Sequence, residues 1–144
     1  MLLGQFKLIL NDNQQLVLPK AFRESFGEGA YATCGFEHNL LIMSEKEFQE
    51  IYKRVAALNI ADPLARLLHR LILGNAAKLD ISANGRVRIP QALLSFAGLE
   101  KEIVLVGQGD YCEAWAPADW DKQSRVLLDT VANSARFAQL DLAL

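Results

Sequence analysis

The clearest pattern in the chain lies in residues 79–90, where apolar and polar positions alternate on both sides of a short polar break. Residues 79–81 precede the break and residues 86–89 follow it, until Pro90 ends the pattern. Alternation puts successive side chains on opposite faces of a strand, so this stretch predicts two β-strands. Asn84-Gly85 within the break predicts a hairpin with a type I′ turn, because that turn needs positive φ at both central residues.

Arg86 and Arg88 share one face of the second strand, because they alternate with Val87 and Ile89. Without further context a solvated charged face is the favoured explanation of such a pair, so this hairpin alone predicts no function.

Similar patterns predict the other elements. Alternation predicts further strands at residues 2–10, 16–18, 30–34, 40–43, 103–106 and 112–115. Helical spacing of apolar residues predicts helices at residues 20–26, 44–58, 62–74, 91–97 and from 117 through 131. Ser44 with Glu47 forms a capping-box pattern, and Asp62-Pro63 supplies an N-cap followed by a first-turn proline. Residues 137–144 receive no assignment.

The two halves of the chain repeat this order of elements. A shift of 71 residues places Leu8 on Leu79, Asn13 on Asn84 and Pro19 on Pro90; after a one-residue slip, Gly35 falls on Gly107, Met43 on Trp115 and Phe48 on Trp120. A copy of about 45 residues is too small to bury a sufficient core alone. An internal duplication therefore predicts two copies packed face to face, with interleaved strands, pseudo-two-fold symmetry and helices outside. Two ordinary hairpin pairs in one α+β domain are the alternative.

Composition allows a packed core and limits the classes of partner. Of 144 residues, 51% are hydrophobic and 22% are charged, which is typical of an ordered domain. The chain lacks a membrane-length apolar run and a secretory start, so we expect a cytoplasmic protein. A net charge of −2 means that any nucleic-acid binding depends on local basic patches.

Neither the cysteines, the histidines nor the tryptophans predict catalysis. Cys34 and Cys112 fit no metal spacing and are expected as small buried hydrophobes. His38 falls in a predicted turn and His69 on a predicted helix, and the sequence has no phosphate loop or nucleophile elbow. We therefore predict no enzyme, no cofactor and no metal site. Trp115 and Trp120 are expected as anchors of the core or of a subunit interface.

Six blocks of residues together point to a known family. They are Leu3-Gly4; Leu18-Pro19-Lys20 with Phe22-Arg23; residues 70–76; residues 85–90; Ala97-Gly98-Leu99 before residues 101–108; and Glu113 with Trp115. Over nearly its whole length the chain resembles the MraZ family of bacterial transcriptional regulators, which carry two AbrB-type swapped-hairpin β repeats. The resemblance implies an α+β fold with a first AbrB-like repeat at 4–47, a helical linker at 48–74, a second repeat at 75–120, and a C-terminal helix and tail at 121–144.

The signature of that family is an Asp, three residues and an Arg in each repeat, with a Pro four residues after the Arg. In the second repeat Arg86 and Pro90 match, and Ser82 stands at the Asp position. Family membership implies that the motif arginines contact DNA, and this role transfers to Arg86. The planar guanidinium can bond guanine O6 and N7 together, a contact that discriminates by roughly 1–3 kcal/mol.

The first repeat departs further from the signature. Pro19 matches, but Asn11 replaces the Asp and Gln15 replaces the Arg. The amide of Gln15 can pair with an adenine edge, although it carries no charge. We take seven residues as DNA-binding candidates, the last five for phosphate contacts or as solvated charges: Arg86, Gln15, Arg88, Lys20, Arg23, Lys7 and Lys78.

The resemblance implies a ring-forming homo-oligomer that binds direct repeats in double-stranded DNA upstream of the cell-division and cell-wall gene cluster, and hence association with the nucleoid. Side-by-side subunits would multiply weak contacts through effective concentration. The altered first repeat favours an alternative, an assembly module of the same fold that has lost DNA binding.

Overall fold

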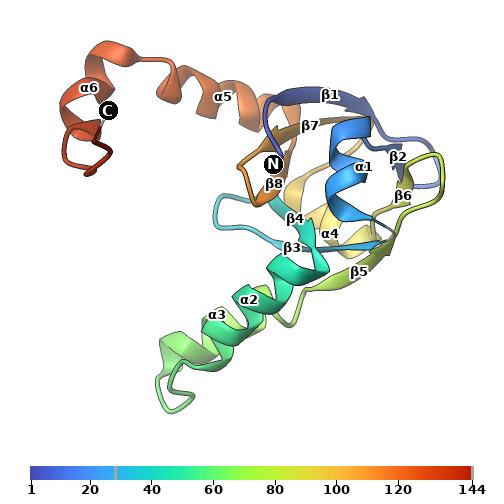
Figure 1. Cartoon of the computed structure of the whole chain (residues 1–144), viewed down its shortest axis with the longest axis horizontal. Helices are drawn as coiled ribbons and strands as arrows, with labels where there is room; N and C mark the ends of the chain where they lie inside the picture. Colours follow the sequence, from blue (N-terminus) through green and yellow to red (C-terminus); the bar gives the residue numbers. More distant parts are fainter. Residues whose placement is uncertain (28, 144) are drawn as a thin grey trace.

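Two β-layers and three groups of helices make up the fold of the computed structural model, which describes residues 1–27 and 29–143 (Figure 1). Its strands are β1 (Gln5–Ile9), β2 (Gln15–Val17), β3 (Gly29–Cys34), β4 (Leu40–Ser44), β5 (Ala77–Asp80), β6 (Arg86–Arg88), β7 (Glu102–Gly107) and β8 (Tyr111–Trp115). Its helices are α1 (Lys20–Phe26), α2 (Glu45–Ala56), α3 (Pro63–Ile72), α4 (Gln91–Ala97), α5 (Pro117–Leu127) and α6 (Thr130–Phe137).

The two halves of the chain are interleaved in one antiparallel sheet. The strand order is β1-β7-β8-β4-β3-β5, so β1 of the first half pairs with β7 of the second, and β5 of the second pairs with β3 of the first. When each strand is replaced by its counterpart in the other repeat, the result is the same strand order read from the opposite edge of the sheet. This indicates a pseudo-two-fold axis between β4 and β8. The structure therefore confirms the predicted α+β fold of two interleaved repeats.

The main core lies between one face of this sheet and the layer formed by α1, α4 and a separate two-stranded ribbon of β2 and β6. Phe22 of α1 is fully buried, and its ring meets Phe6 of β1 edge-on with centroids 5.2 Å apart. Leu16 and Val87 bring the ribbon into the same core. Burial of such side chains is the dominant favourable contribution to folding, so the ribbon is fixed to the body by its inner face.

The opposite face of the sheet carries a smaller cluster. Trp115 and Trp120 pack with ring centroids 5.6 Å apart beside Val104, and Tyr31 stacks on Phe48 at 4.4 Å. Both tryptophans are buried, as expected for core anchors. Cys34 and Cys112 are also buried, which agrees with their prediction as small hydrophobes.

Two helical arms extend from the body, one formed by α2 and α3 and the other by α5 and α6 (Figure 1). The Ser44 hydroxyl accepts the Glu47 N–H at 3.3 Å, and Asp62 accepts the Leu64 N–H at 2.9 Å, so both predicted caps form. No helix in residues 1–27 and 29–143 has the length and apolarity needed to cross a membrane.

The prediction of one helix from 117 through 131 was wrong. The chain forms α5 and α6 with a break at Leu128 and Asp129. The Asp129 carboxylate accepts the Ala132 N–H at 3.1 Å and so caps α6. A short acidic side chain at this point competes for backbone N–H groups and begins a new helix, which the apolar spacing does not reveal.

Candidate nucleic-acid interface

The β2–β6 ribbon presents four side chains on one exposed face. Its register pairs Gln15 with Arg88, Leu16 with Val87 and Val17 with Arg86. Leu16 and Val87 are buried, whereas both arginines are exposed and Gln15 is partly exposed. Because side chains alternate across a strand, the inner pair anchors the ribbon and the other four positions face solvent together. The prediction that Arg86 and Arg88 share one face agrees with this geometry.

The turn before β6 differs from the predicted type I′ turn, and that prediction was wrong. The Gly85 N–H donates to the Ser82 carbonyl at 2.9 Å, so the central residues are Ala83 and Asn84. Within 82–85 only Gly85 has positive φ, at 82°. Moreover, β5 and β6 meet only at an Ile81–Val87 bridge, because each pairs mainly with a strand of the other repeat. Swapping of strands between the repeats overrides the local hairpin signal.

Ser82 and Asn11, the two residues that stand at the Asp position of the family signature, occupy equivalent structural positions. The Ser82 hydroxyl accepts the Arg86 N–H at 2.9 Å, and Asn11 Oδ1 accepts the Gln15 N–H at 2.9 Å. In each turn, therefore, a neutral oxygen accepts the N–H of the residue four positions later. Both side chains hold the following strand in place without adding a negative charge beside it.

Each turn is also bonded to the other repeat. The Leu18 N–H donates to the Gly85 carbonyl at 2.9 Å, and the Ile89 N–H donates to the Gln14 carbonyl at 3.0 Å. Gln14 has a positive φ of 62°, as Gly85 does at the equivalent position. These reciprocal bonds fix both ends of the ribbon, so its exposed side chains project from a supported scaffold.

Lys20 and Arg23 come from α1, which begins directly after β2 and Pro19. Arg23 is half-buried and its Nε donates to the Leu18 carbonyl at 2.9 Å. Its side chain lies across Gly85 so closely that a Cβ at that position would collide with it. Lys20 is exposed in the first turn of α1. The structure thus brings these two predicted residues to the ribbon.

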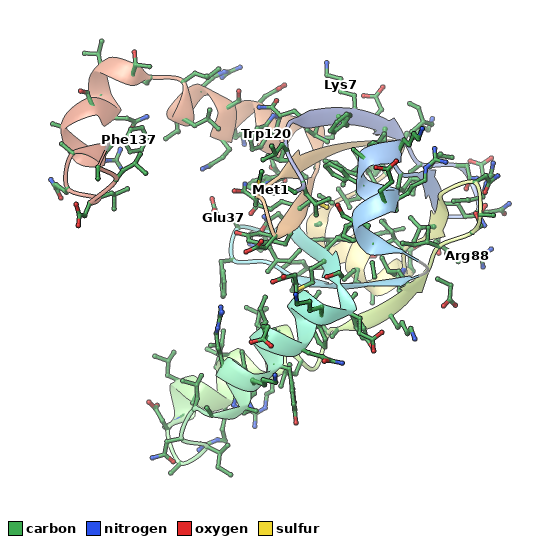
Figure 2. The ribbon with its side chains drawn as sticks, in the orientation of Figure 1. Met1, Lys7, Glu37, Arg88, Trp120 and Phe137 are labelled. Atoms are coloured by element: carbon green, nitrogen blue, oxygen red, sulfur yellow. The ribbon has the colours of Figure 1, made fainter. Side chains whose placement is uncertain are left out.

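The structure does not bring Lys7 and Lys78 to the ribbon. Lys7 lies opposite Val104 and Lys78 opposite Tyr31, so both belong to the sheet face that α2 and α5 cover. Figure 2 shows Lys7 on β1, well separated from Arg88. The apolar neighbours Phe6, Leu8 and Leu79 alternate with these lysines and face the main core.

No ion pair among the described residues neutralises the charges on the ribbon. In residues 1–27 and 29–143, the one ion pair within 4.0 Å joins Lys53 and Glu50 on α2. Arg86 and Arg88 therefore have no carboxylate partner in the described part of the chain. Exposed, unpaired guanidinium groups on a supported ribbon are suited to binding an anionic partner.

Sequence reasoning missed a pair of amides beside this surface. The Gln14 side chain is hydrogen-bonded to that of Gln91, and Gln91 Nε2 also donates to Ser95 Oγ at 3.0 Å. The 71-residue shift contains the signal, because it places Lys20 on Gln91. Gln91 therefore holds the same position at one end of the ribbon that Lys20 holds at the other.

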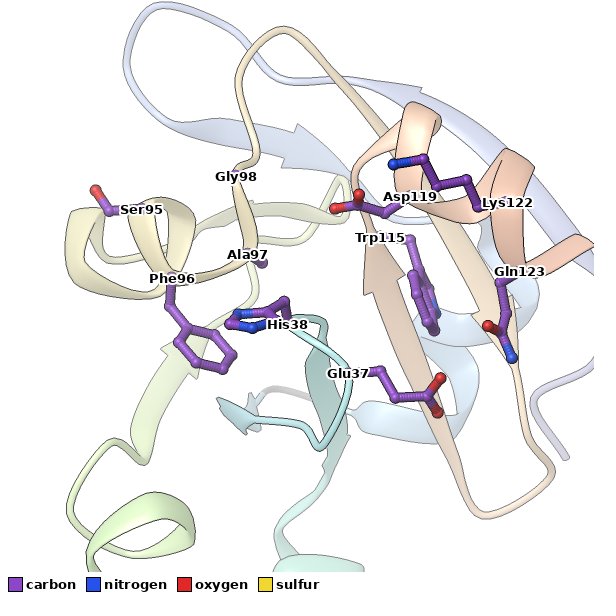
Figure 3. Close-up of a pocket in the computed structure, with 10 residues that line it drawn as sticks. All are labelled: Glu37, His38, Ser95, Phe96, Ala97, Gly98, Trp115, Asp119, Lys122 and Gln123. Carbon is purple, nitrogen blue, oxygen red and sulfur yellow. The ribbon is translucent and has the colours of Figure 1, made fainter.

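A separate open pocket of about 500 Å³ lies between the loop before β4, the end of α4 and the start of α5 (Figure 3). His38 lies against Phe96 with ring centroids 5.5 Å apart, and Glu37, Asp119 and Lys122 line the rim. Within the described ranges, no three His, Cys, Asp or Glu residues form a group suited to a metal ion. The Ser95 hydroxyl that lines the pocket accepts a hydrogen bond from Gln91 Nε2.

Comparison with known proteins gives the family. The family model described as "MraZ protein, putative antitoxin-like" matches residues 1–71 and 72–141, two matches whose starts differ by the same 71 residues as the repeat. A transcriptional regulator MraZ from Thermomicrobium roseum is 33% identical over 127 residues, which is 88% of this chain and 89% of that relative. The relatives of the same name from a Roseiflexus species and Hydrogenovibrio crunogenus are 32% identical over 139 residues and 37% identical over 123 residues.

The Roseiflexus alignment covers 96% of this chain and 95% of the relative, and the Hydrogenovibrio alignment covers 82% and 81%. These matches support a role in transcription regulation and not in catalysis. With a family model that spans both repeats and full-length relatives above 30% identity, the chain belongs to the MraZ family.

Proposed function

We propose that this protein regulates transcription by binding double-stranded DNA through the exposed face of the β2–β6 ribbon. The observation that carries the proposal is the pair Arg86 and Arg88 on a ribbon whose inner face is buried. Both are exposed, and neither has a carboxylate partner among residues 1–27 and 29–143. The major groove of B-DNA is about 12 Å wide and admits a two-stranded ribbon. Arg86 would contact a guanine edge, Gln15 an adenine edge, and Arg88, Lys20 and Arg23 the phosphates.

We further propose that several copies assemble into a ring that binds direct repeats in a promoter. Large apolar side chains remain exposed on both arms, including Leu64 at 70% and Leu67 at 61% on α3 and Val131 at 90% on α6. Leu64 and Leu67 are three residues apart and so neighbours on the surface of α3, and contiguous apolar surface is typical of protein–protein contacts. In a closed ring every subunit has the same orientation, which suits repeats of one polarity. The family resemblance suggests the division and cell-wall gene cluster as target and the nucleoid as location.

A gel-shift titration with DNA from the protein's own upstream region tests the proposal. Arg86→Ala should weaken binding by about fivefold or more, because a bidentate guanine contact is worth roughly 1–3 kcal/mol. Arg54→Ala removes an equal charge from the exposed face of α2 and should bind as wild type does. Affinity should also fall as salt rises, since phosphate contacts release counterions. Equal binding by Arg86→Ala and Arg54→Ala, or no binding by any variant, would contradict the proposal.

An assembly module without DNA binding is the second candidate, favoured by the neutral Gln15 at the signature position for arginine. It predicts a stable oligomer by light scattering and no specific complex in the gel shift. The double variant Asn11→Asp with Gln15→Arg should then create binding, because it restores the charged signature at a turn that already has the required geometry.

A further inference from the structure

The backbone of the ribbon is pseudo-symmetric, but its side chains are not. The 71-residue shift makes the two ends of the ribbon equivalent, and at each end four positions correspond. One end, which we call the arginine end, consists of the 82–85 turn with Arg86, Val17, Lys20 and Arg23. The other, the amide end, consists of the 11–14 turn with the counterparts Gln15, Arg88, Gln91 and Leu94. Three cations thus stand at one end and one at the other.

Contacts across the repeats gather the cations of the arginine end. The Leu18 N–H bonds the Gly85 carbonyl, which places the start of α1 beside this turn. Arg23 then lies over Gly85 and shares a hollow with Ser82 and Glu24. Despite this proximity, Glu24 forms no ion pair in the described part of the chain. The backbone of Gly85 leaves room for the Arg23 side chain, which no larger residue would do.

At the amide end, beside Asp12 and Arg88, four neutral amide side chains form two hydrogen-bonded pairs. Gln14 bonds Gln91, and Asn11 Nδ2 donates to Gln15 Oε1 at 3.3 Å. An amide oxygen has two lone pairs, so Gln15 can still accept a bond from an adenine N6–H while its Nε2 donates to N7. Leu94, the counterpart of Arg23, is buried in the core and offers nothing to a ligand.

We infer, on the basis of the proposed function, that the ribbon binds each DNA site in one orientation, with the arginine end on a guanine and its flanking phosphates and the amide end on an A·T pair. A symmetric ribbon would bind equally well after a half-turn about its pseudo-two-fold axis. Here that rotation would move Arg86 from guanine to adenine and Gln15 from adenine to guanine. Each exchanged bidentate contact is worth roughly 1–3 kcal/mol, so one orientation should exceed the other by at least about tenfold.

Site-directed cleavage of bound DNA tests the orientation. Asp12→Cys and Ala83→Cys place a thiol at equivalent, exposed positions of the two turns. Cys34 and Cys112 are buried, and burial raises the pKa of the Cys112 thiol, with Glu113 raising it further, so an iron chelate should couple to the new cysteine. With chelate attached, each variant should cut one flank of every bound repeat, and the two variants should cut opposite flanks. Wild-type protein treated with the chelate should cut neither.

Equal cutting of both flanks by each variant, with binding intact, would overturn the single orientation and leave the proposed function standing. Absence of binding by all variants and by unmodified protein would overturn both. A second set of variants tests the single orientation separately from the proposed function. Gln15→Arg and Gln91→Lys are added together to each cysteine variant, which makes the two ends of the ribbon alike. These variants should cut both flanks of each bound repeat. Gln49→Arg adds a positive charge to the exposed surface of α2 and should leave the cuts on one flank.

Discussion

At the scale of single residues, the ribbon depends on a few atoms that hold its turns. Ser82 and Asn11 stand where the family signature has aspartates, and each accepts the backbone N–H of the residue four positions later. They therefore supply a hydrogen-bond acceptor at these positions without a negative charge. Gly85 combines a positive φ with the close passage of the Arg23 side chain. The conformation of this glycine and the position of a predicted DNA contact are therefore linked.

Gly85→Ala should destabilise the protein more than Gly98→Ala does. Both glycines have positive φ, at 82° and 63°, but a Cβ at Gly98 meets nothing within 4 Å, whereas one at Gly85 meets Arg23. Gly98→Ala should lower the free energy of unfolding by about 1 kcal/mol through backbone strain alone. Gly85→Ala should cost more and also weaken DNA binding. Urea denaturation of both variants measures the difference, and equal losses would show that Arg23 moves aside freely.

At the scale of elements, the sequence predicted the type and the order of the helices and strands well. It predicted less well which strands pair with one another. Periodicity located every strand near its place, and the repeat predicted interleaved strands without saying which would pair. The structure pairs β1 with β7 and β5 with β3. The type I′ turn predicted from Asn84-Gly85 does not form, because β6 pairs with β2 of the other repeat and not mainly with β5. The turn between β5 and β6 therefore does not need the geometry of a two-residue hairpin loop. Alternation also predicted the shared face of Arg86 and Arg88. It could not place Lys20 and Arg23 beside them, since that depends on how α1 meets the other repeat.

The break between α5 and α6 gives a prediction at this scale. Asp129→Ala removes the oxygen that accepts the Ala132 N–H, and loss of such a cap costs about 0.5–2 kcal/mol. Much of α6 is exposed, so the loss should appear as local opening. Amide hydrogen exchange at residues 130–133 should speed up while the core strands stay protected. Asp141→Ala removes a negative charge from a residue that does not cap a helix, so it should leave the exchange rates unchanged. Equal acceleration in both variants would rule out the capping explanation.

At the scale of the whole molecule, the distribution of apolar surface separates two tasks. The body buries its main core between sheet, ribbon, α1 and α4 and leaves a few apolar side chains such as Ile9 and Phe36 exposed. The arms leave a larger number exposed, including Leu64, Leu67, Val131 and Phe137. The charged ribbon lies on the body, and most of the large exposed apolar side chains belong to the arms that extend from it (Figures 1 and 2). Self-assembly through the arms would thus leave each ribbon free for DNA, and a weak contact per subunit would be multiplied in the assembly.

The double variant Leu64→Glu with Leu67→Glu tests this separation. Burying a carboxylate in an apolar interface costs several kcal/mol per ion, so the assembly should fall apart into smaller species. Multi-angle light scattering after size-exclusion chromatography measures the mass. Arg70→Glu introduces a carboxylate at an exposed polar position of the same helix and should keep the wild-type mass.

The dissociated double variant should keep its fold, because neither leucine is part of the core, and thermal unfolding should stay close to that of the wild type. Its affinity for a single repeat should be unchanged, whereas its affinity for tandem repeats should fall to that of the single repeat, since effective concentration is lost. An unchanged mass would remove the arms from the assembly interface. A smaller mass with undiminished binding to tandem repeats would separate assembly from DNA binding altogether.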